Sequence, residues 1–348
     1  MSLGQAYEFI IQWHITDRCN LKCRHCYQEG AGSREMTFAQ IVAVIQEIAA
    51  MLKDWQEAHG LEFSPSFNLT GGEPFLRPDF FSILKEIRQA GFVSYVLSNG
   101  TMITQERAES LAALGVKEVQ VSLEGPQGVH DGIRGPGSFA ASLQGVRNLQ
   151  AAGVKVSLNF TLSKLNAGYF MDLVDLAVVL GVGSLGFSRL VPAGRGLALL
   201  DQMLPTVEVQ RLYDQIFSLN IPVVKIGTGD PMAAQMSLPP PDPQTEDIPF
   251  AGCAAGTAGL TILPDGTLLP CRRLPIPLGR AGSDALREIW ALSPVLAKLR
   301  DKSQYRDKCG QCKRWAQCRG CRAIAYAYSK SQGPGDFLAS DPQCFIAV

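Results

Sequence analysis

The chain has 348 residues, of which 46% are apolar and 18% are charged, and its 32 basic residues balance its 32 acidic residues. This composition is typical of a globular protein with one large or two modest domains, and the lack of a basic block disfavours nucleic-acid binding. No apolar run reaches the ~18 residues of a membrane span, and no signal peptide is evident, so we expect no membrane association. Its ten cysteines therefore indicate a cytoplasmic protein whose clustered thiols bind metal.

Three cysteines lie on one short loop after the first expected strand. The run Phe9–Ile15 is apolar and rich in β-formers, and Cys19, Cys23 and Cys26 follow it with C-x3-C-x2-C spacing. Three thiolates can hold three irons of a [4Fe–4S] cluster and leave the fourth iron open for chemistry. A zinc site that uses His25, or a loop without metal, remains the alternative from spacing alone.

Strands and helices alternate from this loop to about residue 200. The expected strands are Phe9–Ile15, Phe63–Thr70, Val93–Leu97, Glu118–Leu123, Val154–Leu162 and Leu185–Leu190. Expected helices lie between them, the first capped by Thr37 and several ended by glycine. This order predicts an α/β fold with a parallel sheet, as a partial (β/α)6 TIM-like barrel, with a doubly wound open sheet as the alternative.

Polar residues follow each expected strand, where parallel α/β folds place their chemistry. These residues are Thr70 to Pro74, Ser98 to Gly100, Ser122, Glu124, Asn159, Thr161, Ser188 and Arg189. Gly71 and Gly72 would let a ligand approach the backbone, and Glu73 offers a carboxylate to a cation. A simple Gly-Gly turn with a solvated glutamate is the alternative.

Beyond residue 200 the sequence changes character. We expect a helix at Pro205–Leu219, a short strand at Ile221–Ile226 and a proline-rich linker at Pro231–Pro249. A β-hairpin with its turn at Asp265-Gly266 follows, and then a helix that Asp284 caps. The expected domains are therefore 1–200, a helix and linker at 201–250, and a small cysteine-rich extension at 251–348.

The remaining seven cysteines all lie beyond this linker. They are Cys253, Cys271, Cys309, Cys312, Cys318, Cys321 and Cys344. Seven thiols nearly suffice for two iron–sulfur cubes, and two structural zinc ions are the alternative.

The cysteine loop, with Tyr27 directly after it, resembles the signature of the radical S-adenosylmethionine (SAM) enzymes. The resemblance implies that SAM chelates the open iron and that one electron from the cluster releases a 5′-deoxyadenosyl radical. Thr70 to Pro74 is similar to the GGEP motif of this family, which holds the methionyl amino group. The cofactor-binding residues implied are Tyr27, Gly71, Gly72, Glu73, Pro74, Asn99, Ser122, Glu124 and Arg189. Most relatives have aspartate at the position of Glu124, and no catalytic residue is assigned.

The distal cysteines resemble the SPASM extension of radical SAM enzymes, which carries two auxiliary iron–sulfur clusters. The family pattern implies that Cys253, Cys271 and Cys321 hold the first, with an open or non-cysteine fourth ligand. It implies Cys309, Cys312, Cys318 and Cys344 for the second. Only two residues separate Cys318 from Cys321, where relatives usually have three.

The resemblance implies an enzyme that oxidatively matures a ribosomally made peptide and receives electrons from flavodoxin or ferredoxin. Side-chain modification of a haem-type tetrapyrrole is the alternative, and a multi-cluster electron-transfer protein is the alternative of another class. Arg272 stands where sulfatase-activating relatives carry an aspartate base, which disfavours formylglycine formation.

Overall fold

One continuous sheet connects the N-terminal and C-terminal parts of the chain. The computed structural model describes residues 7–28, 32, 34–60, 62–239 and 247–346. Within them the strands pair in the order β10-β9-β8-β1-β2-β3-β4-β5-β6-β7. Pairing is parallel from β8 through β1 to β7 and antiparallel from β8 to β10. The strands are β1 Tyr7–His14, β2 Phe63–Thr70, β3 Val93–Ser98, β4 Glu118–Ser122, β5 Val156–Leu162, β6 Ser184–Arg189, β7 Lys225–Thr228, β8 Gly259–Ile262, β9 Thr267–Leu269 and β10 Gly279–Arg280.

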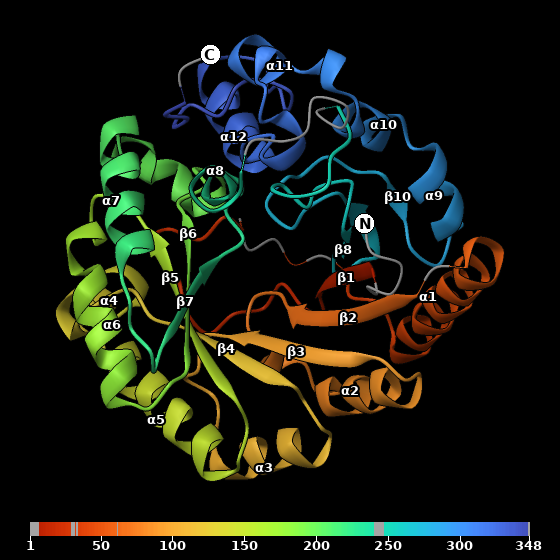
Figure 1. The fold of residues 1–348 in the computed structure, drawn as a ribbon. Helices are drawn as coiled ribbons and strands as arrows, with labels where there is room; N and C mark the ends of the chain where they lie inside the picture. Colours follow the sequence, from red (N-terminus) through yellow and green to blue (C-terminus); the bar gives the residue numbers. More distant parts are fainter. Residues whose placement is uncertain (1–6, 29–31, 33, 61, 240–246, 347–348) are drawn as a thin grey trace.

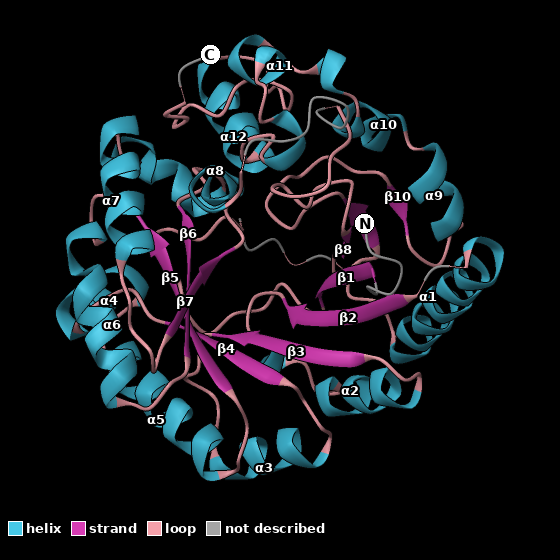
Figure 2. Cartoon of the chain, viewed as in Figure 1, coloured by secondary structure: helices cyan, strands magenta, loops and turns pink. Residues whose placement is uncertain are grey.

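Helices α1 to α7 form an outer layer around the strands, α11 and α12 lie beside the C-terminus, and α9 and α10 lie between α1 and α11 (Figure 1, Figure 2). The helices are α1 Phe38–His59, α2 Phe80–Gln89, α3 Gln105–Ala113, α4 Gln127–Arg134, α5 Ser138–Ala151, α6 Phe170–Val179, α7 Thr206–Ser218, α8 Ala234–Ser237, α9 Leu286–Leu292, α10 Pro294–Arg300, α11 Asp307–Gln311 and α12 Arg322–Gln332. Among the described residues, no helix combines the length and the apolar character needed to cross a bilayer.

The main core lies between the strands and the outer helices. Alternate residues of β1, such as Ile11 and Trp13, are fully buried, as are Ile41 and Val44 on one face of α1. The intervening strand residues include polar side chains such as Gln12, which lines an interior cavity. The sheet therefore has one apolar face that packs on helices and another face that offers polar groups to a ligand.

The predicted α/β class is confirmed, and all six expected strands are present with only small shifts of their ends. Thr37 caps α1 in a capping box with Gln40, as its position predicts. Pro65 lies within β2 without breaking it. Pairing of β2 with β3 begins only at Ser66, so the missing N–H of Pro65 leaves no gap in that ladder.

Three expectations for the C-terminal half are wrong. The seventh strand begins at Lys225, because the residues before it form a turn. Asp284 does not cap a long helix, since its carboxylate accepts the N–H of Arg280 and Pro294 divides that helix into α9 and α10. The first part of the expected linker is helical and partly buried, while its residues 240–246 lie outside the described part of the chain.

The predicted hairpin, β8 and β9, joins the sheet directly at the edge of β1. Gly259 pairs with Ile10, and a Cβ atom at Gly259 would lie 1.8 Å from the Ile10 carbonyl oxygen. Only glycine fits this contact. The pairing brings the cysteine-rich extension beside the strand that leads into the first cysteine loop.

Candidate active site

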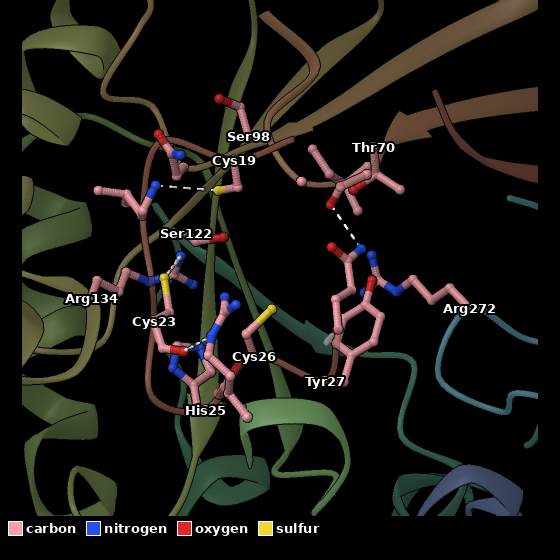
Figure 3. A pocket seen from close by; sticks show the side chains of 18 of the residues that line it. Cys19, Cys23, His25, Cys26, Tyr27, Thr70, Ser98, Ser122, Arg134 and Arg272 are labelled. Carbon is pink, nitrogen blue, oxygen red and sulfur yellow. Dashed lines mark hydrogen bonds between the residues drawn. The ribbon is translucent and has the colours of Figure 1, made fainter. Parts of the chain in front are cut away.

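The first cysteine loop lines a cavity of about 580 Å³ at the carboxyl ends of the parallel strands. Cys19, Cys23 and Cys26 all contribute to its wall, on the same side as Arg134 (Figure 3). Three thiols that face one cavity suit the three-cysteine attachment of a [4Fe–4S] cluster. The cavity also leaves room for a ligand beside it.

Strand-end residues that the sequence places at one rim do meet at this cavity. Its lining includes Thr70, Gly71, Gly72, Ser98, Asn99, Ser122, Asn159, Thr161, Ser188 and Arg189. They come from β2 to β6 or from the loops that follow these strands. The parallel arrangement therefore collects side chains that lie far apart in the sequence.

Gly71 and Gly72 were expected to let a ligand approach the backbone, but in the structure they contact the backbone of the cysteine loop. A Cβ atom at Gly71 would lie 2.2 Å from the carbonyl oxygen of Thr16, and one at Gly72 would lie 2.1 Å from that of Arg18. The N–H groups of Gly72 and Glu73 donate to these same two oxygens at 2.8 Å. The glycines thus dock the cysteine loop against β2, while Gly71 and Gly72 still border the cavity.

Glu73 is fully buried behind Ser98 and Asn99 of the cavity wall and does not itself line the cavity. The Ser98 hydroxyl donates to one carboxylate oxygen at 2.8 Å, and the Asn99 N–H donates to the other at 2.9 Å. Burial nevertheless raises the pKa of Glu73 to about 7. A nearby cation would stabilise the ionised form of this buried carboxyl group. Pro74 begins a buried 3-10 turn, Pro74–Leu76, after it.

Glu124, which the family resemblance implies for cofactor binding, is surrounded by protein partners. Its side chain is fully buried and does not line the cavity. Arg134 Nη2 donates to it at 2.6 Å, His25 Nε2 lies 3.3 Å away, and the Thr161 N–H donates at 2.9 Å. These cationic and hydrogen-bond partners hold the pKa of Glu124 well below its usual range despite burial.

Glu124 instead positions the groups around the cysteine loop. Arg134 also points an N–H at the sulfur of Cys23, at 3.8 Å. The longer side chain of glutamate, compared with aspartate, reaches both Arg134 and His25. Arg134 ends helix α4, which was not expected from the sequence because its eight residues include two glycines and few apolar side chains.

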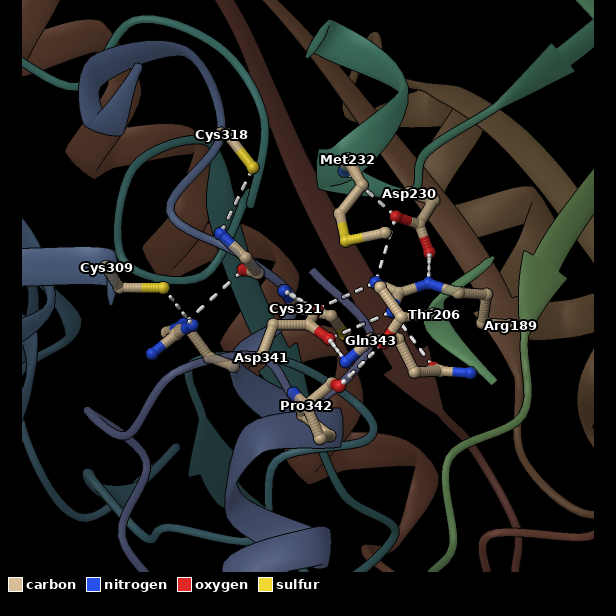
Figure 4. A network of polar contacts seen from close by, with 12 residues as sticks. Arg189, Thr206, Asp230, Met232, Cys309, Cys318, Cys321, Asp341, Pro342 and Gln343 are labelled. Atoms are coloured by element: carbon tan, nitrogen blue, oxygen red, sulfur yellow. Dashed lines mark hydrogen bonds and ion pairs between the residues drawn. The ribbon is translucent and has the colours of Figure 1, made fainter. Parts of the chain in front are cut away.

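Arg189, which the family resemblance implies for SAM binding, lines the cavity but uses its hydrogen-bond donors within the protein. Its guanidinium donates to Asp230 at 2.7 and 3.1 Å, to Asp341 at 2.9 and 2.8 Å, and to Gln343 at 2.9 Å. All five N–H groups are thereby paired. Figure 4 shows this buried network, which ties β6 to the C-terminal segment. Asp341 also accepts the N–H of Cys321, at 2.8 Å.

The segment after β6 holds the cysteine loop in place. Gly196 donates its N–H to the Cys26 carbonyl at 2.9 Å, and Arg195 Nε donates to the Cys23 carbonyl at 3.1 Å. A Cβ atom at Gly194, where φ is +55°, would lie 2.5 Å from the Tyr27 backbone. The backbone at Gly194 therefore lies too close to the cysteine loop for any residue larger than glycine at this position.

The other seven cysteines separate into two groups, each around its own cavity. Cys253, Cys271 and Cys321 line one, with Arg272 and Arg273. Cys309, Cys312, Cys318 and Cys344 line the other. Arg272 and Arg273 also line the first-loop cavity, so the two larger cavities adjoin.

The four-cysteine cavity is rich in N–H groups that point at sulfur. The N–H of Gly320 and the amide of Gln235 reach Cys318 Sγ at 3.3 and 3.2 Å, and the N–H of Arg314 reaches Cys312 Sγ at 3.3 Å. Such donors suit thiolate ligands of an iron–sulfur cluster. Gln235 was missed by sequence reasoning, because it lies in the segment expected to be a linker. In the described part of the chain, no group of three His, Cys, Asp or Glu side chains is arranged to hold a single metal ion.

Comparison with protein-family models matches residues 13–177 to the radical SAM superfamily and residues 253–322 to SPASM, an iron–sulfur cluster-binding domain. An AdoMet-dependent heme synthase of Methanosarcina barkeri is 31% identical over 96% of this chain and 95% of that protein. The mycofactocin maturase MftC of Mycobacterium tuberculosis is 31% identical over 96% of this chain and 82% of that protein.

Among solved structures, Streptococcus suis SuiB bound to S-adenosylmethionine superimposes with a TM-score of 0.71. The match covers 98% of this chain and 78% of SuiB at 16% identity, so it supports the fold. Native anSMEcpe with bound AdoMet gives a TM-score of 0.70 at 18% identity, over 94% of this chain and 93% of that chain. The chain therefore belongs to the radical SAM superfamily and is a radical SAM enzyme with a SPASM iron–sulfur domain.

Proposed function

We propose that this radical SAM enzyme modifies a side chain of a haem-type tetrapyrrole. The observation that carries the proposal is the likeness to the AdoMet-dependent heme synthase of Methanosarcina barkeri, which spans nearly the full length of both chains. From the sequence alone, peptide maturation was the expected function and tetrapyrrole modification the alternative.

The charge of the cavity supports an anionic substrate such as a tetrapyrrole with carboxylate side chains. Arg195, Arg272 and Arg273 line the cavity, and no ion pair joins any of them to a described carboxylate. Guanidinium groups without a carboxylate partner at the edge of a low-dielectric cavity attract carboxylates. Their planar N–H groups also match carboxylate geometry.

The residues around the cysteine loop fit SAM. Cys19, Cys23 and Cys26 would hold the cluster, whose one-electron reduction of SAM supplies the 5′-deoxyadenosyl radical. Glu73, with its raised pKa, would receive the methionyl amino group, since an ammonium ion relieves the cost of a buried carboxylate. Asn99 and Ser122 present hydrogen-bonding groups to the remaining cofactor surface.

The two distal groups of cysteines would hold two auxiliary clusters. Cys253, Cys271 and Cys321 border the substrate side of the cavity through Arg272 and Arg273. A cluster held by these cysteines would lie beside the first-loop cavity and would supply an electron acceptor there. Cys309, Cys312, Cys318 and Cys344, which line a separate cavity, would hold a second cluster that supplies electron transfer.

Peptide maturation is the second candidate, because MftC is similar over 96% of this chain. A solved complex of SuiB with its precursor peptide SuiA also shares this fold. The electron-transfer alternative is not favoured, because residues 13–177 match the radical SAM superfamily in addition to the SPASM match at 253–322.

The test is anaerobic turnover of the cluster-reconstituted enzyme with dithionite, SAM and iron coproporphyrin III. We expect the porphyrin to increase 5′-deoxyadenosine formation and to change mass, and we expect a Cys26→Ala variant to do neither. Formation of 5′-deoxyadenosine without any change in the porphyrin would contradict the tetrapyrrole proposal. Modification of a precursor peptide under the same conditions would establish the second candidate.

A further inference from the structure

A partly buried chain of hydrogen bonds in the cavity wall fixes the direction of one hydroxyl group. His14, at the end of β1, is 2% exposed and lies between Gln28 and Tyr27. The Gln28 Nε2 atom lies 2.9 Å from the carbonyl oxygen of Gly71 and 3.0 Å from Nδ1 of His14. A carbonyl oxygen can only accept, so this Gln28 atom must be the NH₂ nitrogen.

The orientation of Gln28 determines the tautomer of His14. One N–H of Gln28 donates to Gly71, and the other donates to Nδ1 of His14, which therefore carries no proton. The imidazole proton is then on Nε2, 3.3 Å from the Tyr27 hydroxyl. Burial and the nearby charge of Arg272 lower the pKa of His14 to about 3, which is consistent with a neutral ring.

The Tyr27 hydroxyl consequently accepts a hydrogen bond from His14 and keeps its own proton for another acceptor. No described protein group accepts that proton, and Tyr27 lines the cavity. Arg272 and Tyr27 lie together on the wall across from Cys19 and Cys23 (Figure 3). Arg273 lines the cavity too, and its Nε is buried without a hydrogen-bond partner among the described residues.

We propose that Tyr27 and Arg272, assisted by Arg273, form a subsite that binds a carboxylate side chain of the substrate. This inference rests on the proposed tetrapyrrole function and names the residues that would recognise a propionate group. One fixed O–H donor and a planar guanidinium offer a carboxylate donors for both of its oxygens. The subsite lies between the cysteine loop and the Cys253, Cys271 and Cys321 cavity, because Arg272 and Arg273 line both cavities.

The carboxylate of SAM is the other source of the same chemistry, and binding measurements separate the two. Dissociation constants are measured for iron coproporphyrin III, for its methyl ester and for SAM, using the reconstituted parent enzyme and its Tyr27→Phe and Arg272→Gln variants. Arg211→Gln, at an exposed position of α7, is the matched control. Iron content and thermal midpoint verify that each variant is folded and loaded.

We expect Arg272→Gln to weaken binding of the free acid at least about tenfold, which corresponds to 1.4 kcal/mol. Tyr27→Phe, which removes a single oxygen atom, is expected to weaken it about threefold to tenfold. Binding of the ester and of SAM should change less than twofold in both variants. Unchanged acid binding, or an equal loss for the ester, overturns the subsite alone. A loss confined to SAM also overturns it and assigns these residues to the cofactor. Failure of the parent enzyme to bind either porphyrin overturns the proposed function together with the subsite.

Discussion

Replacement of Arg189 by methionine tests whether this arginine supports the fold or binds SAM. The substitution keeps much of the apolar stem but removes a guanidinium that donates five hydrogen bonds to Asp230, Asp341 and Gln343. Two buried carboxylates then face each other without a cation. Removal of one partner from a buried ionic network typically costs about 3–5 kcal/mol of unfolding free energy, and we expect a loss in that range.

The assay is anaerobic urea unfolding of the reconstituted protein, with Arg211→Met on the exposed side of α7 as the control. The control should change the unfolding free energy by less than about 0.5 kcal/mol. At a temperature where Arg189→Met is still folded, its affinity for SAM should equal that of the parent enzyme. A variant of normal stability whose SAM affinity falls at least about tenfold would refute the structural role of Arg189.

Three further changes have defined outcomes. Because the pKa of Glu73 is about 7 in the absence of a cation, binding of the SAM ammonium should release a proton below pH 7. SAM affinity should therefore rise with pH from about 5 to 7 in equilibrium dialysis, and Glu73→Gln should weaken binding and remove this dependence. Gly72→Ala would place a Cβ atom 2.1 Å from the Arg18 carbonyl oxygen and should abolish iron binding at the first loop. Gly168→Ala is the control, because Gly168 has open space around it, and iron and sulfide analysis should show that this variant retains its iron. Thr37→Ala should lower the unfolding free energy by about 1 kcal/mol through loss of the capping box, and an unchanged urea midpoint would contradict that role.

Local sequence patterns were sufficient for much of the site. The spacing of Cys19, Cys23 and Cys26 is a property of one loop, and strand ends in a parallel sheet must converge, so Asn99 and Ser122 were placed at the correct rim. Gly71 and Gly72 were expected to let a ligand approach the backbone, whereas their close contact with the Thr16 and Arg18 carbonyl groups could not be predicted, because it depends on the backbone of a loop that is distant in sequence. The tautomer of His14 could not be predicted from the sequence either, because it follows from contacts among His14, Gln28 and Gly71, which lie on three separate segments.

The sequence by itself determined the class of fold, the alternation of strands and helices and the two cysteine signatures, because each depends on spacing along the chain. Only the tertiary structure decided which polar side chains remain available for a ligand. Arg189 and Glu124 looked free in the sequence, yet Asp230 and Asp341 pair with the first and Arg134 pairs with the second. A buried charge requires a partner, and a partner more than a hundred residues away, such as Asp341 for Arg189, can be identified only when the chain has folded.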